Sequence, residues 1–295
     1  MPRTVGRIGR QLAVVPIAAL GSYLLIAALP LGAEEDSKRQ LPPELVASYR
    51  RDLGIGEPLG FLKPWQKLFR GERLGTSAQG VTGEELLRKI SGSVGVGCVA
   101  MVLALTWALA FAVLRSRRRG SGAWAMGKLI PAIAFGTPVF IPALLLAPYV
   151  AEAGHWLPEL AAALVISASP GIFLGALLTD AVRAELSRDY VRTALGKGLA
   201  PGAVFRRHVV PNVLPALLDS IGPVATALLA GSFAAERVFG LPYFGQLYVV
   251  AVLQKQVAIV VVATTCFAAL LAAVGLCVEL VRLLVDPRAR AAGQP

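Results

Sequence analysis

The sequence predicts an all-α membrane protein, built as a polytopic bundle of six transmembrane helices. Two features of the composition indicate this: 56% of the 295 residues are hydrophobic and only 16% are charged, whereas soluble globular chains carry about 25% charged residues. The third feature is the arrangement of the apolar residues. They gather in six runs long enough to cross, as helix, a hydrocarbon core about 30 Å thick.

The six runs contain no Asp, Glu, Lys or Arg, except that the fifth contains Asp219. The first run could be a secretory signal peptide, because three arginines precede it. We interpret it as a retained helix, because it exceeds the usual core of about 7 to 15 residues and residues 31–33 form a poor A-x-A cleavage site. The predicted spans are 11–33, 90–114, 129–151, 160–179, 209–235 and 256–278.

The basic residues predict which side of the membrane each loop occupies. With the N-terminus in the cytoplasm, 17 of the 29 Lys and Arg residues fall on the cytoplasmic side, and the two short external loops hold only Arg237 and Lys255. Cytoplasmic loops carry the excess of Lys and Arg in membrane proteins. Both termini are therefore expected in the cytoplasm. The net charge of +11 is assigned to this topology, and no nucleic-acid partner is expected.

The segment 34–89 holds the other ten basic residues together with nine acidic ones and is predicted to be external. Turn residues such as Gly54 and Gly71 divide it, and short helices are expected on the outer face, for example at 63–69. It is too short and too rich in Gly and Pro for a separate enzyme domain.

The rest of the chain is divided into a first part at 1–33 (cytoplasmic N-terminus and first helix), a five-helix core at 90–285 and a cytoplasmic tail at 286–295.

Prolines inside the spans favour a transporter over a set of plain anchors. Pro138, Pro170 and Pro215 each remove a backbone hydrogen bond from a predicted helix, and the freed carbonyls are tolerated only against protein or a wet cavity. Packed kinks in any polytopic protein are the alternative interpretation. The pair Gly171 and Gly175 could also let two helices approach closely.

No catalytic, nucleotide or metal site is predicted. The stretch from Gly122 to Lys128 matches the first seven positions of a phosphate-binding loop, but Leu129 replaces the Ser or Thr that would hold magnesium. His155 and His208 are predicted on opposite sides of the membrane. The three cysteines lie in apolar runs without a CxxC or Cys/His cluster. We therefore expect no enzymatic activity and no cofactor or metal bound by this chain.

Asp219 is the exception within the predicted spans, roughly 15 Å along the fifth helix at about 1.5 Å per residue. A carboxylate facing lipid is costly, so this side chain should face the bundle interior, a partner subunit or water. Asp219 is a possible polar residue of a transport pathway. A structural hydrogen bond and a position near the cytoplasmic vestibule are the alternatives.

The predicted cytoplasmic loop at 189–215 has a layout of its own. A helical stretch reaches Lys197, Gly198 is suited to end it, and Ala200, Pro201 and Gly202 begin a second short helix. A helix, a break and a helix lying across the membrane face would form a compact projection. The alternative is a plain connector rich in basic residues.

This loop resembles the EAA loop of the membrane permease subunits of binding-protein-dependent ABC importers, specifically those of the dipeptide, oligopeptide and nickel type. The general pattern is E-A-A-x3-G-x9-I-x-L-P, and the peptide branch reads approximately D-Y-V-R-T-A-x-x-K-G-L. The matching residues are D-Y-V-R-T-A at 189–194, K-G-L at 197–199 and, with nine residues from 199 to 207 preceding it, H-V-V-P at 208–211.

Shorter motifs extend the resemblance along the chain. Residues 71–77 (G-E-R-L-G-T-S) resemble an external G-D-L-G-x-S element with one residue added. Residues 236–245 (E-R-V-F-G-L-P-Y-F-G) resemble E-x-V-F-x-x-P-G-L-G, with Tyr243 and Phe244 in place of Gly-Leu. The D-P-R at 286–288 matches the terminal D-P-R of the family.

The resemblance implies the transmembrane fold of an ABC importer and a division of labour among subunits. This chain would form half of the translocation pathway beside a second homologous permease or a copy of itself, in the inner membrane of a bacterium. Two ABC ATPase subunits, which bind the ATP and magnesium, would drive it, and an external solute-binding protein would deliver the solute. Dipeptides or oligopeptides are the default solute, while nickel, glutathione and oligosaccharides remain open.

The resemblance also implies roles for particular residues. An outer gate or a contact with the binding protein would fall to Glu236, Phe239, Pro242 and Gly245. Contact with the ATPase subunit, through a coupling helix in the EAA loop, would fall to Tyr190, Arg192, Thr193, Ala194, Gly198, His208 and Pro211.

Two other classes of protein were weighed. An ion-coupled secondary carrier should show membrane-embedded ionisable groups in symmetry-related positions and an internal repeat. Asp219 stands alone within the predicted spans and no repeat is visible in the sequence. A scaffold that transports nothing is the second alternative, and co-extraction with an ATPase and a second permease would separate it from an importer subunit.

Overall fold

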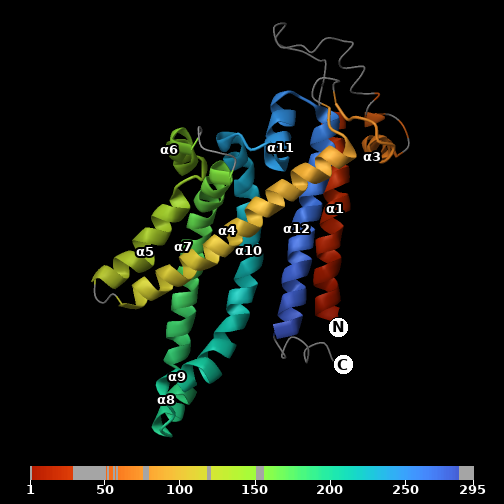
Figure 1. Ribbon diagram of the computed structural model, residues 1–295. Helices are drawn as coiled ribbons and strands as arrows, with labels where there is room; N and C mark the ends of the chain where they lie inside the picture. The colour runs from red at the N-terminus through yellow and green to blue at the C-terminus, as the bar shows by residue number, and fades with distance from the viewer. Residues whose placement is uncertain are drawn as a thin grey trace. The chain divides into compact units, whose positions relative to one another are not determined.

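The computed structural model describes residues 2–28, 51, 53–55, 57, 59–75, 80–117, 121–150 and 156–285 (Figure 1). Within these residues the structure is helical apart from turns, loops and one β-bridge between Leu74 and Val81. His155, residues 31–33 and the motif at 286–288 lie outside the described residues. The elements are α1 (Pro2–Ala28), the 3₁₀-helix η1 (Gly60–Leu62), α3 (Lys63–Phe69), α4 (Gly83–Arg117), α5 (Ser121–Gly136), α6 (Phe140–Val150), α7 (Trp156–Leu186), α8 (Asp189–Gly196), α9 (Pro201–Val204), the π-helix η2 (Phe205–Val209), α10 (Val210–Phe239), α11 (Phe244–Leu253) and α12 (Val257–Val285).

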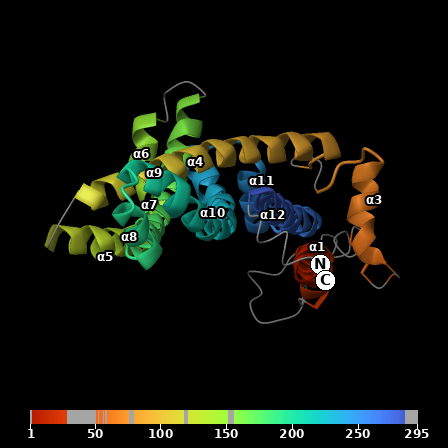
Figure 2. The ribbon, with the colours of Figure 1, turned by 90° about the horizontal axis from the view of Figure 1, so that it is seen from below.

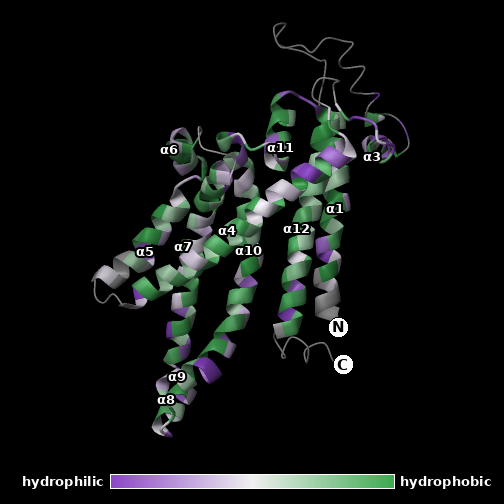
Figure 3. Cartoon of the chain, viewed as in Figure 1, coloured by the Kyte–Doolittle hydropathy of each residue, from purple (hydrophilic) through white to green (hydrophobic). Residues whose placement is uncertain are grey.

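Five helical stretches are long and apolar enough to span a membrane: α1, α4, α7, the run from α9 to α10, and α12. A sixth span is formed if the bent pair of α5 and α6 is counted as one. The long helices are predominantly hydrophobic along their length (Figure 3). The predicted all-α bundle of membrane-spanning helices is therefore confirmed.

The third predicted span, 129–151, is not the single kinked helix that we expected. The chain bends by 74° between α5 and α6. Pro138 causes the break, because it has no N–H to donate and because a proline disfavours the helical conformation of the residue before it. The Thr137 amide still donates to the Ile133 carbonyl at 3.0 Å, but α5 ends at Gly136.

The chain divides into two compact units, one comprising Met1–Gly92 and Pro242–Leu276, the other Ser93–Leu241 and Cys277–Pro295. In the first unit, α3 forms over the 63–69 segment where a short helix was predicted. The start of α4 is a reciprocal cap: the Glu85 amide donates to Thr82 Oγ1 at 3.2 Å, and the Thr82 amide donates to Glu85 Oε2 at 3.0 Å. This capping box explains why the helix begins at Gly83.

The same unit contains a helix that the sequence analysis missed. Residues 236–255 were expected as an external loop, but 244–253 form α11. A run of ten residues, with Gly245 and Gln246 among them, is too short to span a bilayer, so it was not counted among the predicted helices. It lies between Tyr243, which adopts an extended conformation, and Gln254.

In the second unit, α7 and α10 lie side by side (Figures 1 and 2). Helix α4 packs closely on α7 at Gly171 and Gly175. A Cβ atom at Gly171 would lie 2.7 Å from the Ala104 carbonyl oxygen, and one at Gly175 would lie 2.6 Å from that of Ala108. Since real side chains do not approach a carbonyl so closely, these two glycines are required by the α4 and α7 contact.

Candidate functional site

The loop at 189–215 folds as the break-and-helix arrangement that the sequence predicts. Helix α8 ends with Gly198 in the left-handed region at a φ of +80°. The Gly198 amide donates to the Leu195 carbonyl at 3.0 Å, and the Leu199 amide donates to the Ala194 carbonyl at 3.4 Å. These two bonds form a Schellman motif, in which glycine is favoured because a side chain is strained at positive φ.

Helix α9 then begins at Pro201 and continues into η2 and α10. A buried apolar cluster holds these short elements together. The cluster packs against α7 through the partly buried side chains of Leu178, Ala181 and Val182. Burying one such Val or Leu side chain stabilises a fold by about 1.5 to 3 kcal/mol. The loop is therefore a packed projection joined to both α7 and α10, and not a plain connector. Its core residues are Val191, Ala194, Val204, Val209 and Val213.

A hydrogen-bond network joins the ends of the projection. The Tyr190 hydroxyl donates to the Glu185 carboxylate at the end of α7. Asn212 of α10 donates from Nδ2 to the Tyr190 oxygen at 3.2 Å and to the His208 carbonyl at 2.8 Å. Partial burial, and then the hydrogen bond to Glu185, raise the pKa of the Tyr190 phenol above its ordinary value. The phenol is therefore protonated, and able to donate, at neutral pH.

The predicted coupling residues fall into two groups. Tyr190 and His208 are brought together, with ring centroids 6.4 Å apart, whereas Ala194 is only 8% exposed and belongs to the core. The Arg192 side chain is 75% exposed, and Thr193 donates to the Asp189 carbonyl at 3.0 Å. The other exposed side chains give the projection an apolar and basic outer face; they include Leu195, Lys197, Leu199, Phe205, Arg206 and Arg207. Gly198 and Pro211 are exposed as well.

The four predicted outer residues do not form one loop. Glu236 is fully buried in the last turns of α10 and Phe239 is the final residue of that helix. Gly240 caps it at a φ of +68°. Pro242 and Gly245 belong to the other compact unit, where the Pro242 carbonyl accepts a hydrogen bond from Lys89 Nζ at 2.8 Å. Gly245 is buried in the first turn of α11.

Asp219 has a cationic partner that the sequence analysis did not identify. Its Oδ1 atom lies 2.8 Å from Nη1 of Arg282 in the last turn of α12. The Arg282 side chain is 22% exposed and that of Asp219 53% exposed. This ion pair supports a structural role, which was one of the alternatives considered for Asp219.

A second ion pair was also missed. Arg115 Nη2, on a side chain only 7% exposed, lies 2.8 Å from Asp180 Oδ1 of α7, and Arg115 Nη1 donates to the Ala176 carbonyl at 3.1 Å. A Cβ atom at Gly127 would lie 2.6 Å from Arg115 Nη2. Gly127, the last glycine of the stretch that resembles a phosphate-binding loop, thus leaves room for the Arg115 guanidinium.

Among the residues that the structure describes, no group of three or more His, Cys, Asp or Glu side chains could hold a metal ion. The spanning helices and the packed loop between α7 and α10 define a polytopic helical membrane protein. Residues 125–291 match the family model described as "Binding-protein-dependent transport system inner membrane component". The chain belongs to this family and is a permease subunit of an ABC importer.

Two curated relatives are similar over most of their length. The chain is 27% identical over 267 residues to the "Probable peptide ABC transporter permease protein y4tP" of Sinorhizobium fredii, covering 84% of this chain and 85% of that one. It is 25% identical over 288 residues to the "Oligopeptide transport system permease protein OppB" of Escherichia coli strain K12, covering 91% and 92%. A solved structure titled "Crystal structure of an amino acid ABC transporter with histidines" matches with a TM-score of 0.45 and 16% identity over 63% of this chain and 91% of the other.

Proposed function

We propose that this permease imports short peptides and that the projection at 189–215 receives the mechanical work of a separate ATPase subunit. The peptide assignment is supported by the names of the two curated relatives, a peptide permease and an oligopeptide permease. The observation that carries the coupling assignment is the apolar cluster that fixes α8, α9 and η2 to α7 and α10.

The mechanism follows from that packing. A force applied to a flexible connector is lost in the connector, but a force on a packed projection moves the helices from which it emerges. Since α7 enters the projection and α10 leaves it, both helices would tilt together when the ATPase subunits close. ATP binding outside the membrane domain would in this way bias the pathway between inward-facing and outward-facing states.

The distribution of charge gives the topology, and membership of the family gives the partner subunits. Both termini and the projection lie in the cytoplasm of a bacterial cell, in accord with the excess of Lys and Arg in the segments assigned to that side. A second permease, or a second copy of this chain, completes the pathway, and two ATPase subunits carry the ATP and magnesium. The chain itself holds no ATP, because Leu129 stands where a phosphate-binding loop needs a hydroxyl.

The residues at the end of α10 and the start of α11 are assigned to the external side of the membrane. Phe239 at the end of α10 and, in the other compact unit, the exposed Pro242 before α11 are each assigned to contact with the incoming binding protein or to the external gate. Glu236 and Gly245 are buried, and they serve this role by fixing the end of α10 and the start of α11 within their own units. Asp219 contributes to the pathway by holding α10 against α12 through Arg282, and not by contact with solute.

Uptake by the complete importer tests this function. The permease is expressed with its own binding protein and ATPase in a bacterial strain that lacks other peptide importers, and uptake of a labelled tripeptide is compared with uptake of nickel, glutathione and a trisaccharide. We expect ATP-dependent uptake of the tripeptide alone. Uptake of one of the other three solutes without the tripeptide would contradict the peptide assignment, and uptake that persists without the ATPase would contradict the coupling assignment.

A further inference from the structure

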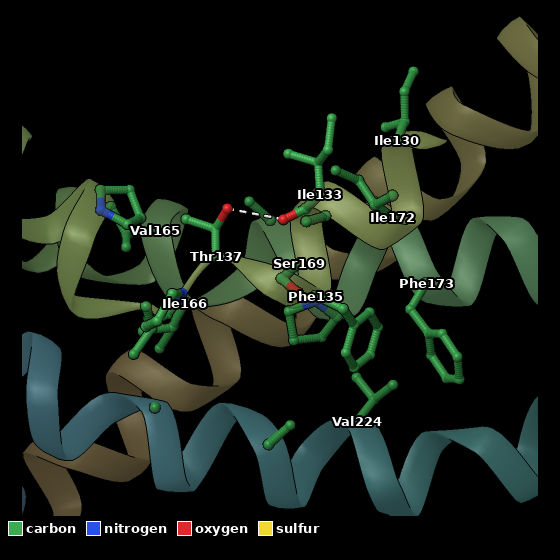
Figure 4. Close-up of a pocket in the computed structure, with 18 of the residues that line it drawn as sticks. Ile130, Ile133, Phe135, Thr137, Val165, Ile166, Ser169, Ile172, Phe173 and Val224 are labelled. Carbon is green, nitrogen blue, oxygen red and sulfur yellow. Dashed lines mark hydrogen bonds between the residues drawn. The ribbon is translucent and has the colours of Figure 1, made fainter. Parts of the chain in front are cut away.

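The second compact unit contains a cavity of about 780 Å³ between α5, α7 and α10 (Figure 4). Its lining includes Phe135 of α5 and Phe173 of α7, whose rings meet edge to face at 4.9 Å, and Val224 of α10. No Asp, Glu, Lys or Arg is among the lining residues. This volume lies within the range of about 300 to 1,000 Å³ that is typical of small-molecule sites. An apolar wall without a counter-charge disfavours a charged side chain.

The cavity lies at the break between α5 and α6, where the lining includes Thr137, Pro138 and Val139. Two lining prolines cannot donate the helical hydrogen bond to the carbonyl four residues earlier. Pro138 has no N–H for the carbonyl of Ala134, and Pro170 has none for the carbonyl of Ile166; all four residues line the cavity. The Thr137 hydroxyl donates to the Ile133 carbonyl at 2.8 Å, as Figure 4 shows, so its oxygen faces a ligand only as an acceptor.

The cavity therefore combines apolar walls with two backbone carbonyls that receive no helical hydrogen bond from the proline four residues on. A lipid chain supplies no donor, and a spanning helix of a second permease uses its own N–H groups internally. A peptide supplies both an apolar side chain and free N–H groups. We propose that this cavity binds an apolar side chain, aliphatic or aromatic, of a peptide in transit, and that the Ala134 and Ile166 carbonyls accept hydrogen bonds from the peptide backbone. This inference rests on the proposed function as a peptide importer.

Filling the cavity tests the inference. Ala227 lines it from α10 and is exposed, so Ala227→Phe adds a ring to the open space without displacing a buried side chain. Ala216 is also exposed on α10 but lies outside the lining, and Ala216→Phe is the matched control. Uptake of trileucine and of triglycine is measured in the complete importer with its own binding protein and ATPase, at equal levels of inserted permease.

We expect Ala227→Phe to lower the ratio of trileucine to triglycine uptake about tenfold, the discrimination typical of lost apolar contacts in a pocket, while Ala216→Phe leaves the ratio unchanged. An unchanged ratio in Ala227→Phe would overturn this inference without affecting the proposed function. If the variant with an unchanged ratio also loses the second permease from the purified complex, the cavity is a contact with that subunit instead. Failure of the wild-type importer to take up either tripeptide would instead contradict the proposed function as well.

A second measurement does not depend on the folding of a variant. A tripeptide whose central side chain carries a benzophenone is photolysed with the wild-type importer during turnover, and the labelled segments are identified by mass spectrometry. We expect labels within 130–139 and 165–173, which trileucine suppresses and triglycine does not. Labelling elsewhere in the chain that excludes both segments would contradict the inference.

Discussion

Asp219 Oδ1 lies 2.8 Å from Arg282 Nη1, which joins α10 to the last turn of α12. Since the Asp219 side chain is 53% exposed, we expect the pair to contribute about 0.2 to 1 kcal/mol, the range of exposed ion pairs. Asp219→Asn and Arg282→Gln should then reduce uptake by similar, modest amounts, and the exchange Asp219→Arg with Arg282→Asp should restore it. Uptake of neutral and cationic tripeptides is the measurement.

The same variants separate pairing from direct contact with solute. If Asp219 touches a cationic group of the solute, Asp219→Asn will abolish uptake of the cationic tripeptide while Arg282→Gln has no effect, and the charge exchange will not rescue it. That pattern would contradict the structural role.

The Arg115 and Asp180 pair depends on a glycine. Gly127→Ala places a methyl group against the Arg115 guanidinium, whereas a Cβ atom at Gly136, on the same helix, meets nothing within 4 Å. Both glycines are helical, so Ala at either position gains helix propensity of up to about 1 kcal/mol. Gly127→Ala also displaces the Arg115 guanidinium from Asp180, whose carboxylate is 62% exposed, and we expect it to be less stable than Gly136→Ala by about 1 kcal/mol, the net contribution of one hydrogen bond. Thermal unfolding of the purified permease in detergent measures both, and equal melting temperatures for the two variants would show that the contact with Arg115 contributes nothing.

Gly198 provides a test of the projection's shape. A Cβ atom meets nothing within 4 Å at either Gly198 or Gly196, but only Gly198 has a positive φ. Gly198→Val should therefore strain the turn by about 1 to 2 kcal/mol, with membrane insertion unchanged and with loss of the ATPase from the purified complex or of uptake. Gly196→Val lacks this strain and should retain both. Wild-type uptake by Gly198→Val with the ATPase bound would reduce the projection to a connector.

The Tyr190 network predicts a flat response near neutral pH. Because the folded protein raises the pKa of the phenol, the stability that the protonated hydroxyl contributes is fully present below its ordinary value of about 10 and is lost as pH rises through the folded value. Amide exchange within 189–215 should thus be constant between pH 6 and 9 apart from intrinsic chemistry, and Tyr190→Phe should raise it at every pH in that interval. Loss of protection in the wild type below pH 9, absent in Tyr190→Phe, would contradict this assignment.

Local patterns predicted most of the fold. Apolar runs of about 20 residues have few alternatives to spanning helices, and the Gly198 and Pro201 signals act within one turn of their own position. Pro138 predicts a kink in the third span, but the presence of a proline does not determine whether the helix bends slightly or breaks. Helix α11 was missed because a largely apolar run of ten residues that contains Gly245 and Gln246 is compatible with a packed loop as well as with a helix.

The contacts within the candidate sites were harder to predict, because they join distant parts of the sequence. Arg115 and Arg282 read as ordinary basic residues at the ends of spans, and only packing shows that each is paired with an aspartate of another helix. Asn212 likewise joins Tyr190 across 22 positions of sequence. Ala194 belongs to a motif of the family, but its burial depends on how α8 packs.

Site-specific cross-linking tests the central claim most directly. Arg192 is 75% exposed on the projection, and Phe69 is 85% exposed on the segment assigned to the outside. Each is replaced by cysteine in a permease lacking Cys98, Cys266 and Cys277, and a photoactivatable maleimide is attached in the assembled importer. We predict that Arg192→Cys cross-links to the ATPase subunit and that Phe69→Cys does not. A cross-link to the ATPase from Phe69→Cys without one from Arg192→Cys would contradict both the topology and the coupling role of the projection.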